Sequence, residues 1–174
     1  MTPTDSAFWR GAIAVAMLFL ANPAAAEFQS RDEALAALEK YNRLIESQPN
    51  WAVPHTLRGD AYYALDDLHG AVQSYTAALR LDDRRDRAYF GRGMALGRMG
   101  LVDEGIADLD VYIQRHPDSS LAYTKRGVRN IWRNRLDEAE RDLKRAIAAR
   151  HTGSVTVDML ERFIAKWDRP EGEK

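Results

Sequence analysis

Three glycines, Gly59, Gly93 and Gly127, recur at a fixed interval of 34 residues. Each glycine directly follows an arginine and is followed twelve positions later by another small residue. Aligning the chain on these glycines superimposes three whole segments, 52–85, 86–119 and 120–153. A period of this length indicates a stack of helical hairpins, in which each unit buries its apolar face against its neighbours.

Each segment predicts two helices joined by a short turn. In the middle segment the turn contains Gly100, which can adopt the left-handed conformation that ends many helices. Asp66 and Asn134 stand at the same point of the other two segments, and both residue types tolerate this conformation well. The second helix then presents an apolar face, and Pro117 ends it because proline cannot continue a helix.

Glycine in the interior of a helix is unfavourable by about 1 kcal/mol relative to alanine. Three glycines at one position of the repeat therefore predict that the two helices of each hairpin approach closely there. We expect Gly93 to face Gly105 and Gly59 to face the small residue Ala71.

The arginines before the glycines predict ion pairs across each hairpin. Asp108 and Asp142 follow Arg92 and Arg126 by 16 residues, whereas Arg58 has Ser74 at that distance. We interpret these arginines as structural, which makes Arg92→Ala destabilising because Asp108 would lose its partner. The alternative is that they contact an acidic ligand.

The pattern resembles the tetratricopeptide repeat family, in the bacterial variety with Arg-Gly in the first helix. The middle repeat carries the family positions Tyr89, Gly93, Gly105, Leu109 and Pro117. The first repeat has Gly59, Tyr62, Ala71, Tyr75 and Ala78, and the third has Tyr123, Gly127, Ala139, Leu143 and Ala146. The resemblance implies an all-α, right-handed superhelical solenoid of three tetratricopeptide-like hairpins with flanking cap helices.

The flanking segments have the features of end caps. In 27–50, Ser30 and Glu33 fit a capping box, and a helix with an apolar face follows to about Ser47. A second capping helix is predicted over 154–168, followed by a tail at 169–174. Such ends are needed because a terminal repeat would otherwise expose its apolar face.

Residues 1–26 lie outside the repeat and have the order of a secretory signal peptide. Arg10 precedes an uninterrupted apolar run of 11 residues, and a helix breaker and three alanines follow. We expect cleavage between Ala26 and Glu27, and a periplasmic protein that does not contact the membrane after cleavage. The alternative is an uncleaved inner-membrane anchor, which the short run disfavours because a spanning helix needs about 20 residues.

In the family, the first helix of each hairpin lines the concave wall of the superhelix. The resemblance therefore implies a partner-binding groove formed by Thr56, Asp60, Tyr63, Phe90, Met94, Arg98, Thr124, Lys125, Val128, Ile131 and Trp132. Tryptophan is a common hot-spot residue, so Trp132 is the main predicted anchor, and Arg98 and Lys125 suit an acidic group. The alternative places Tyr63, Val128 and Ile131 in the core.

Some relatives bind the C-terminal carboxylate of chaperone tails with a lysine and asparagines in this wall. At those positions this chain has Thr56, Asp60, Phe90, Met94, Thr124 and Val128. Binding of chaperone tails is therefore not expected from the resemblance.

The composition offers no support for catalysis or for nucleic-acid binding. With 25 basic and 26 acidic residues, the chain lacks the basic excess that drives general nucleic-acid binding. It has no cysteine, which excludes thiol catalysis and thiolate metal sites. We interpret the histidines as surface or turn residues without zinc-site spacing: His55, His69, His116 and His151. No phosphate loop or nucleophile motif occurs, so we predict a non-enzymatic chain without cofactor or metal.

Together, these features predict an adaptor or scaffold of the bacterial cell envelope that binds a peptide or protein segment in its concave groove. One alternative is an accessory subunit of an envelope enzyme or secretion complex. The other is a structural module that associates with itself through the ends of the stack.

Overall fold

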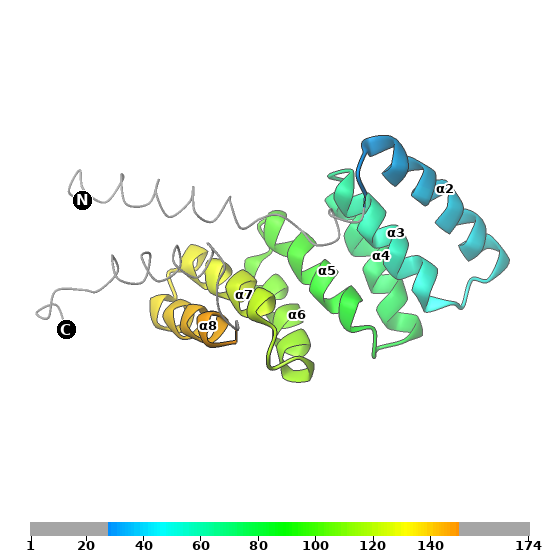
Figure 1. Ribbon diagram of the computed structural model, residues 1–174. Helices are drawn as coiled ribbons and strands as arrows, with labels where there is room; N and C mark the ends of the chain where they lie inside the picture. The colour runs from blue at the N-terminus through cyan, green and yellow to red at the C-terminus, as the bar shows by residue number, and fades with distance from the viewer. Residues whose placement is uncertain (1–27, 150–174) are drawn as a thin grey trace, which may run out of the picture.

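The computed structural model describes residues 28–149. Over this range the chain forms seven α-helices and no strand (Figure 1). The helices are α2 (Arg31–Ser47), α3 (Ala52–Ala64), α4 (Leu68–Leu81), α5 (Asp86–Arg98), α6 (Val102–Arg115), α7 (Ser120–Trp132) and α8 (Leu136–Ala148). Outside the described residues lie the predicted signal peptide at 1–26, positions 150–153 of the third repeat, the capping helix at 154–168 and the tail at 169–174.

Three hairpins, α3–α4, α5–α6 and α7–α8, stack side by side in chain order (Figure 1). The second helix of each hairpin also contacts the first helix of the next, so that α4 packs on α5 and α6 packs on α7. The contact of α2 with α3 follows the same scheme, which puts α2 in the place of a second helix from a preceding hairpin. The predicted all-α solenoid is confirmed.

The start of α2 is the predicted capping box. The hydroxyl oxygen of Ser30 accepts a hydrogen bond from the backbone N–H of Glu33 at 3.1 Å. The Glu33 carboxylate accepts one in return from the backbone N–H of Gln29 at 2.7 Å. The Ser30 bond satisfies one N–H group that the helix start leaves without a partner, and the Glu33 bond reaches one residue beyond the N-cap.

The turn inside each hairpin has the predicted left-handed residue. Asp66, Gly100 and Asn134 have φ angles of 68°, 86° and 55°, and each lies between the two helices of its hairpin. Asparagine, aspartate and glycine adopt this conformation at the lowest energy, so the residue types at this position fix how each hairpin reverses direction.

The helix crossings explain the repeated glycines. A Cβ atom on Gly93 would lie 2.9 Å from the carbonyl oxygen of Gly105, and one on Gly105 would lie 2.8 Å from that of Gly93. These two glycines face each other as predicted. Gly59 differs from the prediction, because the atoms nearest to it belong to the ring of Tyr75 and not to Ala71. An aromatic ring there needs a glycine opposite, whereas two small residues would leave a void.

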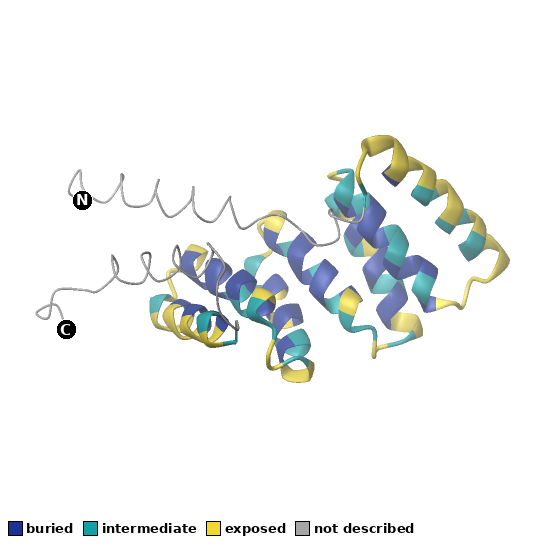
Figure 2. Cartoon of the chain, viewed as in Figure 1, coloured by how far each residue is buried: buried dark blue, intermediate teal, exposed yellow. Residues whose placement is uncertain are grey.

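The hydrophobic core runs along the stack between the two rows of helices. Figure 2 shows buried residues concentrated on α3, α5 and α7, whereas α2 is mostly exposed. The fully buried side chains include Tyr75, Met94, Leu109 and Leu143, each contributed by a different helix. The first helices are therefore the more buried row of the solenoid, and they carry the residues of both candidate surfaces described next.

Candidate partner-binding surface

The predicted groove residues all lie on the first helices α3, α5 and α7. Nine of them are buried in the structure, namely Thr56, Asp60, Tyr63, Phe90, Met94, Thr124, Lys125, Val128 and Ile131. The other two, Arg98 and Trp132, are exposed. Each is the last residue of its helix, and they stand 34 residues apart at equivalent positions of successive repeats.

Arg98 is held at the end of α5 by two contacts with the preceding hairpin. Its guanidinium forms an ion pair with Asp66 and lies 5.1 Å from the centroid of the Tyr63 ring. Trp132 has 39% of its surface exposed, although tryptophan is highly buried on average. A cation fixed over an aromatic ring and an exposed indole thus form the accessible end of the wall.

Beneath this end, α7 carries two buried cations one turn apart, Lys125 and Arg129. The Arg129 guanidinium donates hydrogen bonds to the carbonyl oxygens of Lys125, at 2.9 Å, and of Gly93 and Met94, both at 3.2 Å. Burial lowers the pKa of Arg129 to about 10, so it remains charged at neutral pH. Burial, and to a smaller extent the charge of Arg129, lower the pKa of Lys125 to about 8.

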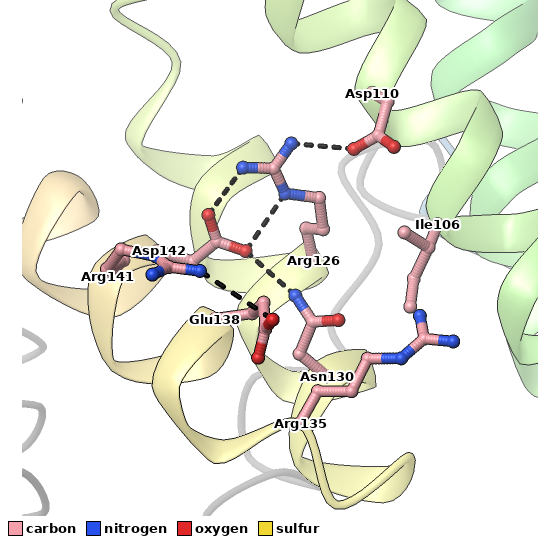
Figure 3. A pocket seen from close by; sticks show the side chains of 8 residues that line it. All are labelled: Ile106, Asp110, Arg126, Asn130, Arg135, Glu138, Arg141 and Asp142. Atoms are coloured by element: carbon pink, nitrogen blue, oxygen red, sulfur yellow. Dashed lines mark hydrogen bonds and ion pairs between the residues drawn. The ribbon is translucent and has the colours of Figure 1, made fainter.

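A second candidate surface lies on the side of the solenoid formed by the second helices, where arginines of the first helices form a regular ladder. Figure 3 shows its last step, in which Arg126 of α7 binds two aspartates. The Nε and Nη2 atoms of Arg126 donate to the Asp142 carboxylate on α8, at 2.9 and 2.5 Å. Its Nη1 atom donates to Asp110 on α6 at 2.6 Å. The arginine therefore ties its own hairpin closed and joins it to the hairpin before.

Arg92 repeats this geometry one hairpin earlier. Its Nε and Nη2 atoms donate to Asp108 on α6 at 2.7 and 2.8 Å, and its Nη1 atom donates to the Thr76 hydroxyl on α4 at 3.3 Å. Hydrogen bonding to Asp108 raises the pKa of Arg92 against the opposing effect of burial. The predicted pairs of Arg92 with Asp108 and of Arg126 with Asp142 are confirmed.

The other half of the ladder was not predicted from the sequence. Each arginine also reaches a residue 16 positions before it: Asn42 for Arg58, Thr76 for Arg92 and Asp110 for Arg126. The signal was available, because these three residues share one position of the 34-residue register. Their different chemical types concealed the relationship.

A polar pocket of about 440 Å³ opens beside the last step of the ladder (Figure 3). It is lined by Ile106, Asp110, Arg126, Asn130, Arg135, Glu138, Arg141 and Asp142. The side-chain nitrogen of Asn130 donates to Asp142 at 3.1 Å, so this residue, which replaces the apolar side chain of the other repeats, extends the ladder. The charges that line the pocket are paired: Arg126 binds Asp110 and Asp142, and Arg141 lies 3.7 Å from Glu138. Arg135 pairs at 2.8 Å with Asp103, which lies outside the lining.

The histidines within 28–149 occupy separate environments. His55 is buried and its Nε2 atom lies 3.0 Å from the carbonyl oxygen of Pro49, so its interpretation as a surface or turn residue was wrong. The ring of His116 is partly exposed, with its Nε2 atom 2.7 Å from Asp86. Residues 28–149 contain no group of three or more metal-liganding side chains. The helices of this range are too short or too polar for any of them to span a membrane.

Comparison with known proteins places this architecture among the tetratricopeptide solenoids. Family models described as "TPR repeat" and "Tetratricopeptide repeat" match residues 59–100 and 87–119. The Arabidopsis thaliana protein "Hsp70-Hsp90 organizing protein 2" is 21% identical over 130 residues, which cover 72% of this chain and 23% of that protein. The Schizosaccharomyces pombe "Anaphase-promoting complex subunit 3" is 28% identical over 105 residues, or 58% of this chain and 15% of that protein. The chain spans less than a quarter of the length of such curated relatives.

Solved structures share the fold over much of the chain. "MamA 41-end from Desulfovibrio magneticus RS-1" superimposes with a TM-score of 0.71 at 15% identity, covering 97% of this chain and 88% of that one. The "First TPR of Spaghetti (RPAP3) bound to HSP90 peptide SRMEEVD" gives 0.61 at 18% identity, covering 68% and 94%. The "TPR2B-domain:pHsp70-complex of yeast Sti1" gives 0.60 at 25% identity, covering 67% and 97%.

Proposed function

We propose that this chain is a non-catalytic interaction module of the bacterial cell envelope. It binds a peptide or protein segment along the wall formed by α3, α5 and α7, with Trp132 as the apolar anchor. Arg98 supplies a cation at the equivalent position of the preceding repeat. Binding of this kind needs surface and not chemistry, which agrees with the absence of catalytic motifs from the sequence.

The observation that carries this proposal is the exposure of Trp132 at the C-terminal end of α7, where the preceding apolar side chains Val128 and Ile131 are buried. An indole left 39% exposed, together with a positioned arginine at the equivalent place of the preceding repeat, has the composition of an interface hot spot. Solved structures with this fold include the RPAP3 domain with an HSP90 peptide and the Sti1 domain with an Hsp70 complex. These two complexes support peptide binding by the same kind of solenoid, with a different partner for this chain.

The proposed location rests on residues 1–26, whose order of charge, apolar run and small residues is that of a signal peptide. The N-terminus of the protein purified from the periplasmic fraction tests it. A mature chain that starts at Glu27 is the expected result. A full-length chain that stays with the inner membrane would favour the uncleaved anchor.

The binding wall is tested by crosslinking the tagged protein in its native cells and identifying what it holds. Trp132→Ala combined with Arg98→Ala removes the accessible part of the wall, whereas a change at the buried Lys125 would disturb the fold as well. Trp51→Ala is a matched control, because Trp51 is 43% exposed and precedes α3 in the loop after α2.

We expect partners that persist in Trp51→Ala and disappear in the double variant, with the helical melting curves of both variants preserved. An unchanged set of partners in the double variant would exclude this wall as the working surface. Copurification at fixed stoichiometry with an enzyme or secretion complex would then favour an accessory subunit. A concentration-dependent mass of the purified protein would favour self-association.

A further inference from the structure

The first step of the arginine ladder lacks the carboxylates that the later steps contain. On α3, the Nε atom of Arg58 donates to the Ser74 hydroxyl and its Nη1 atom to the side-chain oxygen of Asn42, both at 3.1 Å. Both partners are neutral, and Arg58 forms no ion pair with any residue in 28–149. The number of aspartates per arginine therefore rises from none at Arg58 to one at Arg92 and two at Arg126.

The unused donor of Arg58 can be identified from the other two steps. In Arg92 and Arg126, the Nε and Nη2 atoms together hold both oxygens of one carboxylate. Ser74 occupies the position of the repeat that Asp108 and Asp142 occupy in the later hairpins. A serine side chain has a single oxygen, however, and it accepts only from the Nε atom. The Nη2 atom of Arg58 has no partner among the described residues, while Nε and Nη1 hold the planar group in place.

We propose that Arg58 binds a carboxylate carried by a partner protein, on the side of the solenoid where α2 and α4 flank α3. The incoming group takes the role that Asp108 and Asp142 play in the following hairpins. A guanidinium fixed by two neutral hydrogen bonds is preorganised for this role, because its fork matches a carboxylate and little further ordering is needed. Arg58 is partly exposed, so a side chain from outside can reach it, whereas Ser74 is buried behind it.

This contact is distinct from the wall that carries the proposed function. Trp132 lies on α7, two hairpins further along the stack, and Arg58 faces the second helices. A partner could therefore touch the solenoid on two sides, with an apolar contact at one and an acidic contact at the other.

The test follows the side-chain Nε–Hε signals of the three ladder arginines by NMR in the purified protein. The probe is a tetraglutamate peptide with an amidated C-terminus, compared with tetraglutamine of the same form. We expect a saturable shift of the Arg58 signal with tetraglutamate alone. The Arg92 and Arg126 signals serve as internal controls and should stay in place, because aspartates already occupy them.

Ser74→Asp is the decisive variant, because it supplies from within the carboxylate that the other steps contain. It should raise the melting temperature and weaken the Arg58 response to tetraglutamate by roughly tenfold or more. Ser74→Asn introduces a side chain of nearly the same volume as the aspartate but without its charge, and this variant should retain the response. Because Ser74 is buried, Asn42→Asp repeats the test at a half-buried position of α2, and it too should weaken the response.

Several results would overturn the proposal. These are the absence of a saturable shift, equal shifts of all three arginines, or a full response in both aspartate variants. A response to inorganic phosphate without one to tetraglutamate would exclude a carboxylate partner. Tetraglycine with a free C-terminus distinguishes binding of a C-terminal carboxylate from binding of an acidic side chain. A saturable shift with tetraglycine alone would show that the site binds chain ends and not acidic side chains. Loss of the response in Trp132→Ala would also contradict the proposal, since that residue lies in the other surface.

Discussion

The guanidinium of Arg129 on α7 lies directly against Gly97 on α5, where any side chain would collide with it. Arg129 has 1% of its surface exposed, and carbonyl oxygens of α5 and α7 hold it there. The equivalent position in the first repeat is Tyr63 and in the third Ile131, so only the middle repeat makes room for this cation. The contact joins the second and third hairpins through their first helices.

Gly97→Ala should therefore destabilise the protein although alanine is the better helix former. The helix propensity favours alanine by about 1 kcal/mol, but overpacking of a filled site typically costs about 1–3 kcal/mol. Arg129 could move aside only by giving up its carbonyl contacts. In an Arg129→Ala background the collision is absent, so the same change should become stabilising by about 1 kcal/mol. Urea unfolding of the four proteins measures this reversal, and equal effects in both backgrounds would rule out the contact.

The ladder predicts an order of sensitivity among its arginines. Arg92→Met should cost about 3 kcal/mol, because it strands the Asp108 carboxylate, whose side chain is 9% exposed. Arg58→Met should cost only about 1 kcal/mol, since its partners are neutral. Adding Asp108→Asn to Arg92→Met should recover part of the loss. Thermal melts of the variants decide the order, and an equal loss for both arginines would contradict it.

The buried Lys125 predicts that stability rises with pH between about 8 and 10. Its pKa is about 8 in the folded protein and about 10.4 in an unfolded chain. The unfolded state then binds more protons over this interval, so the free energy of unfolding should increase with pH, by roughly 3 kcal/mol at most. Above pH 10 other groups act in opposite directions, because burial raises the pKa of Tyr75 and of Tyr63, which lowers stability there, and lowers the pKa of Arg129, which raises it. Urea titrations from pH 7 to 10 measure the rise, which Lys125→Met should abolish.

The hydroxyl of Tyr75 predicts a specific loss on its removal. It donates to the buried carboxylate of Asp60 at 2.7 Å, and the other carboxylate oxygen accepts from Arg87 at 2.8 Å. Tyr75→Phe keeps the ring against Gly59 but removes this donor, which should cost about 2 kcal/mol. Tyr112→Phe is the control, because its ring contacts with Phe90 and His116 survive the change. If the two variants unfold at the same urea concentration, the Asp60 bond does not stabilise the fold.

The sequence predicted the architecture well because the features that fix it are local and repeated. The residue types of Asp66, Gly100 and Asn134 indicate the turns, and the pair Ser30 and Glu33 indicates the start of α2. The ion pairs of Arg92 and Arg126 were also predictable, since a constant spacing across a hairpin with known geometry brings the two residues together.

The buried cations were harder to foresee. Lys125 was predicted as a groove residue from its position in the register, yet it is 2% exposed, and Arg129 gave no signal at all. Their burial depends on what faces them from α5, above all on the absence of a side chain at Gly97. A pattern of hydrophobic residues along one helix cannot reveal a space that belongs to another. The partners of Arg58 were missed for a related reason, because asparagine and serine do not resemble the aspartates that replace them.

The unequal steps of the ladder give the solenoid a direction. The link between α2 and the first hairpin through Asn42 is neutral, as is the link from Arg92 to Thr76, whereas Arg126 joins the last two hairpins through Asp110 with a charged bond. In a one-dimensional stack, cooperativity depends on such nearest-neighbour terms. Fraying should therefore begin at α2, which has a single buried residue and a neutral link to the first hairpin, so its amide hydrogens would exchange first. A ligand that binds Arg58 would therefore stabilise the end of the solenoid that unfolds most readily.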